Sequence, residues 1–116
     1  MAEHFGLTSV GAVQVIRLQL PEHLDSGEFD RINESLLAVL AAKAGGSWVL
    51  DLSGLAYAGS SVLGLMVNLR QRVKQAGGRL VLCGLSERLL QVFRTCSLES
   101  LFLISRSVSD AVERAR

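Results

Sequence analysis

The segment from Trp48 to Met66 constrains the fold most, because it passes from an apolar run to a helical pattern within a few residues. Its first part, Trp48–Leu52, is typical of a strand buried on both faces of a sheet. A loop of small residues follows, and we expect a helix to begin at Ser60 or Ser61 and to end near Gln75. Backbone N–H groups and the positive end of the helix dipole then meet at one corner, which favours a phosphate group.

The other elements are expected on both sides of this segment. We expect strands at 4–10, 12–20, 80–83 and 101–104, and helices at 28–43, from Ser86 onward, and at 111–114 after Ser107 or Ser109. Pro21 is expected to stop the second strand, and Asp25 and Ser26 are candidate N-caps in the loop before the first helix. A hairpin followed by repeated β–α units predicts one α/β domain over residues 1–116, with a mixed sheet, a parallel centre and about four packed helices.

Composition excludes several classes of function. Hydrophobic residues make up 49% of the chain and the net charge is +1, which indicates a globular domain. The one weak basic cluster, Arg70–Lys74, has no aromatic residues between its cations, so we expect no nucleic-acid partner. The longest apolar run, Leu36–Ala42, is too short to span a bilayer, and no signal peptide is recognisable. We therefore expect a cytoplasmic protein that does not insert into membranes.

The sequence offers no catalytic, cofactor or metal motif. It contains no G-x-G-x-x-G sequence, P-loop or catalytic triad, so we expect no enzymatic activity. Cys83 and Cys96 lie in or next to apolar segments and lack the spacing of metal ligands, which predicts two buried thiols in a reducing compartment. Asp51 ends a buried strand, where an unpaired carboxylate would be costly, so we expect it to cap the following turn.

The expected helix after Ser60 has two faces that differ in character. On an ideal helix the residues opposite Ser60 form a core face made of Val62, Leu65, Met66, Leu69 and Val73. The strip on the side of Ser60 carries no charge and consists of Leu63, Gly64, Val67 and Gln71. A partner backbone could approach closely at Gly64 and pack on the two aliphatic residues, or a neighbouring segment of the chain could cover the strip.

Ser60 itself allows two interpretations. A serine where a loop meets a helix commonly acts as the N-cap, accepting from the N–H of Val62 or Leu63. Its hydroxyl could instead accept a phosphate, which the helix N-terminus would tolerate. Ser61 is the alternative acceptor, or the cap that leaves Ser60 free. The acidic group that includes Asp25 is typical of a solvated helix start, and it could contact a partner if it lies beside Ser60.

These motifs together resemble the STAS domain family, and more narrowly the bacterial anti-sigma factor antagonists. The resemblance rests on Asp51-Leu52-Ser53-Gly54, on Ser60-Ser61 followed by Leu63-Gly64, and on Gln75-Ala76-Gly77-Gly78 before a strand. It implies that Ser60 is phosphorylated by an anti-sigma factor with serine kinase activity and dephosphorylated by a serine/threonine phosphatase. It also implies that the unphosphorylated protein binds the anti-sigma factor and frees a sigma factor for transcription.

The sequence departs from the family motif at two positions. Gly59 stands where the family has Asp before the acceptor, and Val62 stands where it has Gly. These departures favour an alternative, in which the chain is a non-phosphorylated STAS subunit of a lipid-transport ATPase or of a stress-signalling scaffold. In the first hypothesis the partner-binding residues are Asp25, Gly59, Ser60, Ser61, Leu63, Gly64 and Val67.

Overall fold

The computed structural model describes residues 4–20, 25–43 and 45–116. Its elements are β1 (Phe5–Val10), β2 (Val13–Leu18), α1 (Ser26–Ala42), β3 (Ser47–Asp51), α2 (Ser60–Gln75), β4 (Arg79–Cys83), α3 (Glu87–Thr95), β5 (Leu103–Ser105) and α4 (Val108–Ala115). Every element expected from the sequence is present, with ends that differ by a few residues. The expected strand stop at Pro21, and the loop residues up to Leu24, lie outside the described residues.

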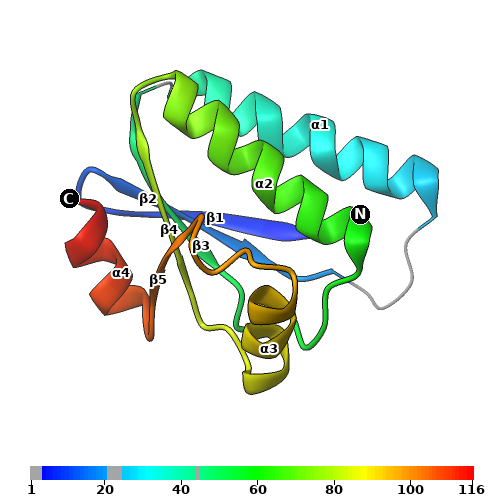
Figure 1. Ribbon diagram of the computed structural model, residues 1–116. Coiled ribbons are helices and arrows are strands. Elements are labelled where there is room, and N and C mark those ends of the chain that lie inside the picture. Colours follow the sequence, from blue (N-terminus) through cyan, green and yellow to red (C-terminus); the bar gives the residue numbers. More distant parts are fainter. Residues whose placement is uncertain (1–3, 21–24, 44) are drawn as a thin grey trace.

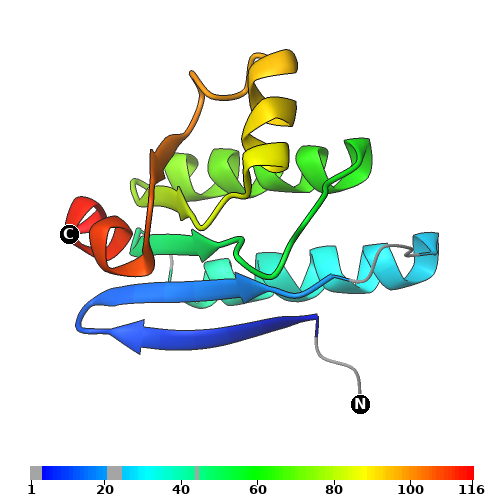
Figure 2. The same ribbon diagram turned by 90° about the horizontal axis from the view of Figure 1, so that it is seen from below.

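The strands form one mixed sheet in the order β1-β2-β3-β4-β5. β1 pairs antiparallel with β2 through the turn at Gly11, and the remaining neighbours are parallel. Figure 1 shows α1 and α2 together over one face of the sheet, with α4 on the other side. Figure 2, seen from below, shows β1 at the edge of the sheet and α1 and α2 behind the strands. The predicted mixed sheet with a parallel centre and packed helices is therefore confirmed.

β3 is buried on both faces, as its apolar sequence predicted. Trp48 and Leu50 point to the side of α1 and α2, whereas Val49 points to the side of α4, because successive strand residues alternate between faces. All three are 0–1% exposed. The sheet is thus covered by helices on both sides, the condition under which a parallel strand carries no polar face.

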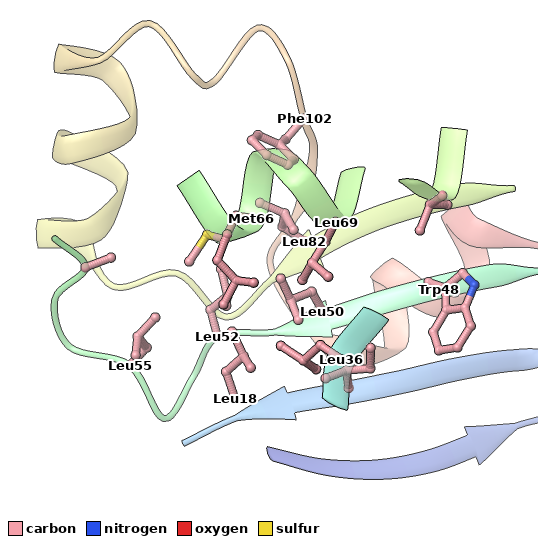
Figure 3. Packing of buried hydrophobic residues seen from close by; sticks show 14 of the residues in the cluster. Leu18, Leu36, Trp48, Leu50, Leu52, Leu55, Met66, Leu69, Leu82 and Phe102 are labelled. Carbon is pink, nitrogen blue, oxygen red and sulfur yellow. The ribbon is translucent and has the colours of Figure 1, made fainter. Parts of the chain in front are cut away.

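The larger of two cores lies under α1 and α2. Helical spacing places Leu36 of α1 and Met66 and Leu69 of α2 against the sheet, where they are 0–1% exposed. Figure 3 shows Leu36, Met66 and Leu69 gathered around Leu50 of the central strand. Phe93 of α3 joins the same core and packs on Phe102 at 5.7 Å between ring centroids. This packing fixes the start of α2 relative to the sheet.

The smaller core bears on the prediction for the cysteines. Cys83 of β4 is buried among Val49, Val81 and α4, as predicted. Cys96 is exposed, so the prediction of two buried thiols is wrong for this residue. It is the C-cap of α3, and the apolar positions around it that reach the larger core are Phe93 and Leu98. Nearness in sequence to apolar residues therefore did not imply burial.

Three of the helices begin at polar side chains that cap them. Asp25 accepts from Glu28 N at 2.8 Å, Ser86 from Leu89 N at 3.1 Å, and Ser107 from Asp110 N at 3.2 Å. These contacts confirm the predicted caps at Asp25 and Ser107. Within the described ranges, no helix is both long and apolar enough to cross a bilayer, and no cluster of three or more metal-ligating side chains occurs.

Candidate functional site

The candidate site lies where β2, β3 and β4 end and the helices that follow them begin. In open parallel sheets, ligands and partners meet the protein at this carboxyl edge. A cavity of about 600 Å³ opens there. It is lined by Leu20, Asp25, Ser26, Phe29, Gly54, Leu55, Ala56, Tyr57, Gly59, Ser60, Ser61, Val62 and Arg88. The starts of α1, α2 and α3 therefore contribute side chains to one hollow.

The loop between β3 and α2 is held at its base by Asp51. This carboxylate is 8% exposed and accepts a hydrogen bond from Ser53 N at 3.0 Å, as the sequence predicted for a turn cap. Across the loop, Gly84 has φ +73°, and a Cβ there would lie 2.9 Å from Asp51 Oδ1 and 2.9 Å from Ser53 N. Only glycine fits this conformation and this close approach. The loop thus leaves the sheet in a fixed direction.

Ser60 is not the N-cap of α2. The cap is Gly59, which is extended at φ −82° and ψ −178° and has no side chain to accept a bond. Ser60 and Ser61 are the first two helical residues, and both are exposed. Among the described residues neither hydroxyl has a hydrogen-bonded side-chain or backbone partner. The interpretation of Ser60 as a cap is therefore wrong, because the chain turns into the helix one residue earlier.

Asp25 also lines the cavity, at the start of α1. Its side chain accepts from the backbone N–H of Glu28, and the Glu28 side chain reaches back to the Asp25 N–H at 3.5 Å, which completes a capping box. The Glu28 N–H bond holds the pKa of Asp25 below its usual range. The residue is therefore a carboxylate at neutral pH. The structure brings Asp25, Gly59, Ser60 and Ser61 to the same cavity.

Tyr57 and Arg88, two polar residues that line this cavity, were not predicted from the sequence as site residues. The guanidinium carbon of Arg88 lies 5.2 Å from the centroid of the Tyr57 ring, which is a cation–π distance. Tyr57 is the single tyrosine of the chain and lies between two alanines, and it is 53% exposed. The position of Arg88 near the site could have been inferred, because in a parallel sheet the helix after β4 must begin at the same edge as α2.

The other predicted partner-binding residues continue along α2 beyond the cavity. Gly64 is exposed, and a Cβ there would meet nothing within 4 Å. Leu63 and Val67 are half-buried and pack against the larger core, so the strip is less open than an ideal helix suggested. Gln71 is exposed. The accessible part of the strip is thus centred on Gly64, one helical turn from Ser60.

This arrangement suits an anionic group, such as a phosphate, that is reversibly attached to a hydroxyl. The first turn of α2 presents N–H groups that no described side chain caps, and the helix dipole adds positive potential there. Arg88 supplies a full positive charge on the same cavity. The described residues of the cavity include no His, Cys or pair of carboxylates, the usual groups for acid–base or nucleophilic chemistry.

The fold and the cavity define a small α/β domain that presents two hydroxyls at the N-terminus of a helix. Comparison with protein families matches residues 8–111 to the STAS domain. The chain therefore belongs to the STAS domain family, as its motifs indicated.

Solved structures share this fold. An anti-sigma factor antagonist (STAS) domain protein from Planctomyces limnophilus is 23% identical with a TM-score of 0.82, over 96% of this chain and 97% of that chain. A variant of RsbS from Moorella thermoacetica is 18% identical with a TM-score of 0.79, over 97% and 95%. The Bacillus cell fate determinant SpoIIAA in its phosphorylated form is 22% identical with a TM-score of 0.68, over 97% and 99%. A search of curated proteins finds no significant match.

Proposed function

We propose that this protein is an anti-sigma factor antagonist that is switched by phosphorylation of Ser60, with Ser61 as the alternative acceptor. The unmodified protein binds an anti-sigma factor that is also a serine kinase, and a serine/threonine phosphatase restores that form. The single observation that carries the proposal is that both hydroxyls are exposed on a cavity at the start of α2 and neither serves as a cap. The protein acts by binding and catalyses no reaction of its own.

The switch works through local charge. A phosphate adds about −1.5 to −2 charges at neutral pH. On Ser60 it would lie at the N-terminus of α2, where N–H groups and the helix dipole tolerate it, so the fold need not change. The same charge would stand one turn from Gly64, on a strip without charged residues. A partner that packs an apolar or acidic surface there would be repelled or would leave the phosphate poorly solvated.

The fold family supports this proposal. One structure of the same fold is an anti-sigma factor antagonist domain protein, and another is SpoIIAA in a phosphorylated form. Gly64 supports docking independently, because an exposed glycine in mid-helix destabilises the helix by roughly 0.5–1 kcal/mol relative to alanine and fills no packing role here. Close approach of a partner backbone would account for a glycine at position 64.

A second candidate is the non-phosphorylated STAS subunit. It is favoured by Gly59, which leaves no carboxylate beside Ser60, and by Val62, which is half-buried against the core. In that case α2 would bind a constant partner, and its hydroxyls would have no regulatory role. The two candidates differ in whether the protein gains a phosphate when ATP and an active partner kinase are present.

The test combines binding and mass. Purified anti-sigma factors with a kinase domain, taken from the same genome, are titrated with this protein by calorimetry and are then supplied with Mg²⁺ and ATP. The proposal predicts binding by one of them, a gain of one phosphate on Ser60, and loss of binding afterwards. Binding without phosphate in the presence of active kinase would favour the second candidate.

Two variants separate docking from folding. Gly64→Gln places a side chain where a Cβ meets nothing within 4 Å, so the fold should tolerate it while partner binding weakens at least tenfold. Ser35→Gln adds comparable bulk at an exposed position of α1 and should leave binding unchanged. Equal affinities for Gly64→Gln and the wild type would contradict docking on this strip.

A further inference from the structure

Arg88 occupies a position that helix electrostatics disfavour. It lies in the first turn of α3, where the positive end of the dipole favours acidic rather than basic side chains. No carboxylate among the described residues lies within ion-pair distance of its guanidinium, whereas Arg94 on the same helix pairs with Glu99 at 3.6 Å. The guanidinium lies instead over the Tyr57 ring. Such a local conflict commonly marks a functional site.

The Tyr57 ring connects Arg88 to the start of α2. A Cβ on Gly59 would lie 4.0 Å from Tyr57 Cε2, and Arg88 lies 5.2 Å from the centroid of the same ring. The α3 cap also touches the loop, because Ser86 Oγ donates to the carbonyl oxygen of Ala56 at 3.4 Å. The beginning of α3 is therefore held against the loop that carries Ser60, and Arg88 and Ser60 line one cavity.

We propose that Arg88 is the counter-ion for a phosphate on Ser60, and that the phosphate draws the guanidinium off the Tyr57 ring. This inference rests on the phosphorylation proposed above. A guanidinium forms two parallel hydrogen bonds to a phosphate, and these charge-assisted bonds are stronger than an exposed cation–π contact. Phosphorylation then has two effects at once: it adds negative charge at Ser60, and it uncovers the aromatic ring of Tyr57.

Movement of Arg88 would also change the surface that a binding partner meets at Tyr57. Tyrosine and arginine are frequent energetic centres of protein interfaces, and Tyr57 is 53% exposed at the rim of this cavity. With Arg88 over it, Tyr57 presents a fixed, cation-covered ring. With Arg88 on the phosphate, the ring is released. Arg88 is a positioning residue in this switch, since it acts through the phosphate and the tyrosine.

To test this, phosphoserine is incorporated at position 60 by genetic encoding, so that no kinase is needed. The ³¹P titration midpoint of the phosphate is compared in four backgrounds: wild type, Arg88→Gln, Arg88→Lys and the matched control Arg94→Gln. A cation close to the phosphate should lower the midpoint by about half a pH unit relative to Arg88→Gln. Arg94→Gln should behave as the wild type, and Arg88→Lys should recover part of the effect. Asp25, the other charged side chain among the described residues that line the cavity, is common to all four.

A second readout follows the tyrosine. Tyr57 is the single tyrosine of the chain, so its ring resonances are assigned without ambiguity. They should shift on phosphorylation in the wild type, and much less in Arg88→Gln. Equal phosphate midpoints in the wild type and Arg88→Gln would overturn the proposal. A larger Arg88-dependent shift with phosphoserine at 61 would overturn the assignment to Ser60. Because the phosphate is encoded, these results are independent of whether cells phosphorylate the protein.

Discussion

The carboxylate of Asp51 accepts a hydrogen bond of 3.0 Å from the backbone N–H of Ser53, at the point where the chain leaves β3. This bond satisfies a carboxylate that is 8% exposed, and it sets the direction of the loop that carries Tyr57 and Ser60. Gly84 packs directly against both groups from the end of β4. The candidate site therefore depends on a contact between two strand ends.

Replacing Gly84 by alanine tests this contact. The residue has φ +73°, and its Cβ would lie 2.9 Å from Asp51 Oδ1 and Ser53 N, so strain and collision add. Gly84→Ala should lower the free energy of unfolding by more than about 1–2 kcal/mol in urea denaturation. Gly77→Ala is the control, since Gly77 has φ +83° but open space around a Cβ. If the two variants lose equal stability, the close packing at Gly84 contributes nothing.

Gly59 offers a second test, because it caps α2 without a side chain. Its φ of −82° is accessible to any residue, and a Cβ would meet only Tyr57 at 4.0 Å. Gly59→Asp should stabilise the fold by a few tenths of a kcal/mol, whereas Gly59→Ala should destabilise it by up to about 1 kcal/mol. Urea midpoints of the two variants give the comparison. A destabilised Gly59→Asp would mean that residue 59 does not cap the helix in solution.

Asp25 should make stability depend on pH in a defined direction. Its folded-state pKa is lowered, first by the hydrogen bond from Glu28 N, so its contribution is fully present above the unfolded pKa and is lost as pH falls through the folded one. The melting temperature of the wild type should therefore exceed that of Asp25→Ala at pH 7, and the gap should narrow below about pH 4. A gap that stays constant from pH 7 to pH 3 would contradict the ionised cap.

The two thiols should differ in reactivity. Burial, together with the nearby Asp51 carboxylate, raises the pKa of Cys83 to about 12, whereas Cys96 is exposed. Because the thiolate is the reactive form, a thiol reagent at about pH 8 should label one cysteine per folded molecule and both after unfolding. Mass analysis of the peptides should place the fast label on Cys96. Rapid labelling of Cys83 in the folded protein would show that the α4 side of the sheet opens readily.

Much of this fold could be predicted because local patterns and burial agree. The apolar run at Trp48 identified the central strand, and the polar residues at Asp25, Asp51 and Ser107 cap the turns and helices that follow them. Alternation and helical spacing are local properties of the chain, so a single sequence carries them.

The features that escaped prediction depend on backbone angles or on distant contacts. Glycine and serine both adopt the extended angles of an N-cap, so the sequence could not decide between Gly59 and Ser60. The contact of Arg88 with Tyr57 requires α3 to pack beside the β3–α2 loop, which no local pattern encodes. Leu63 and Val67 were expected on the outer side of α2, but they are half-buried against the larger core.

The most direct test of the central claim is the intact mass of the protein isolated from its native cells, measured beside a Ser60→Ala variant. We predict a fraction carrying one added phosphate in the wild type and none in the variant. A Ser61→Ala variant, with the adjacent exposed hydroxyl removed, should keep the phosphate. Wild-type protein that carries no phosphate in any growth condition, while its kinase-type partner is present and active, would contradict the phosphorylation switch.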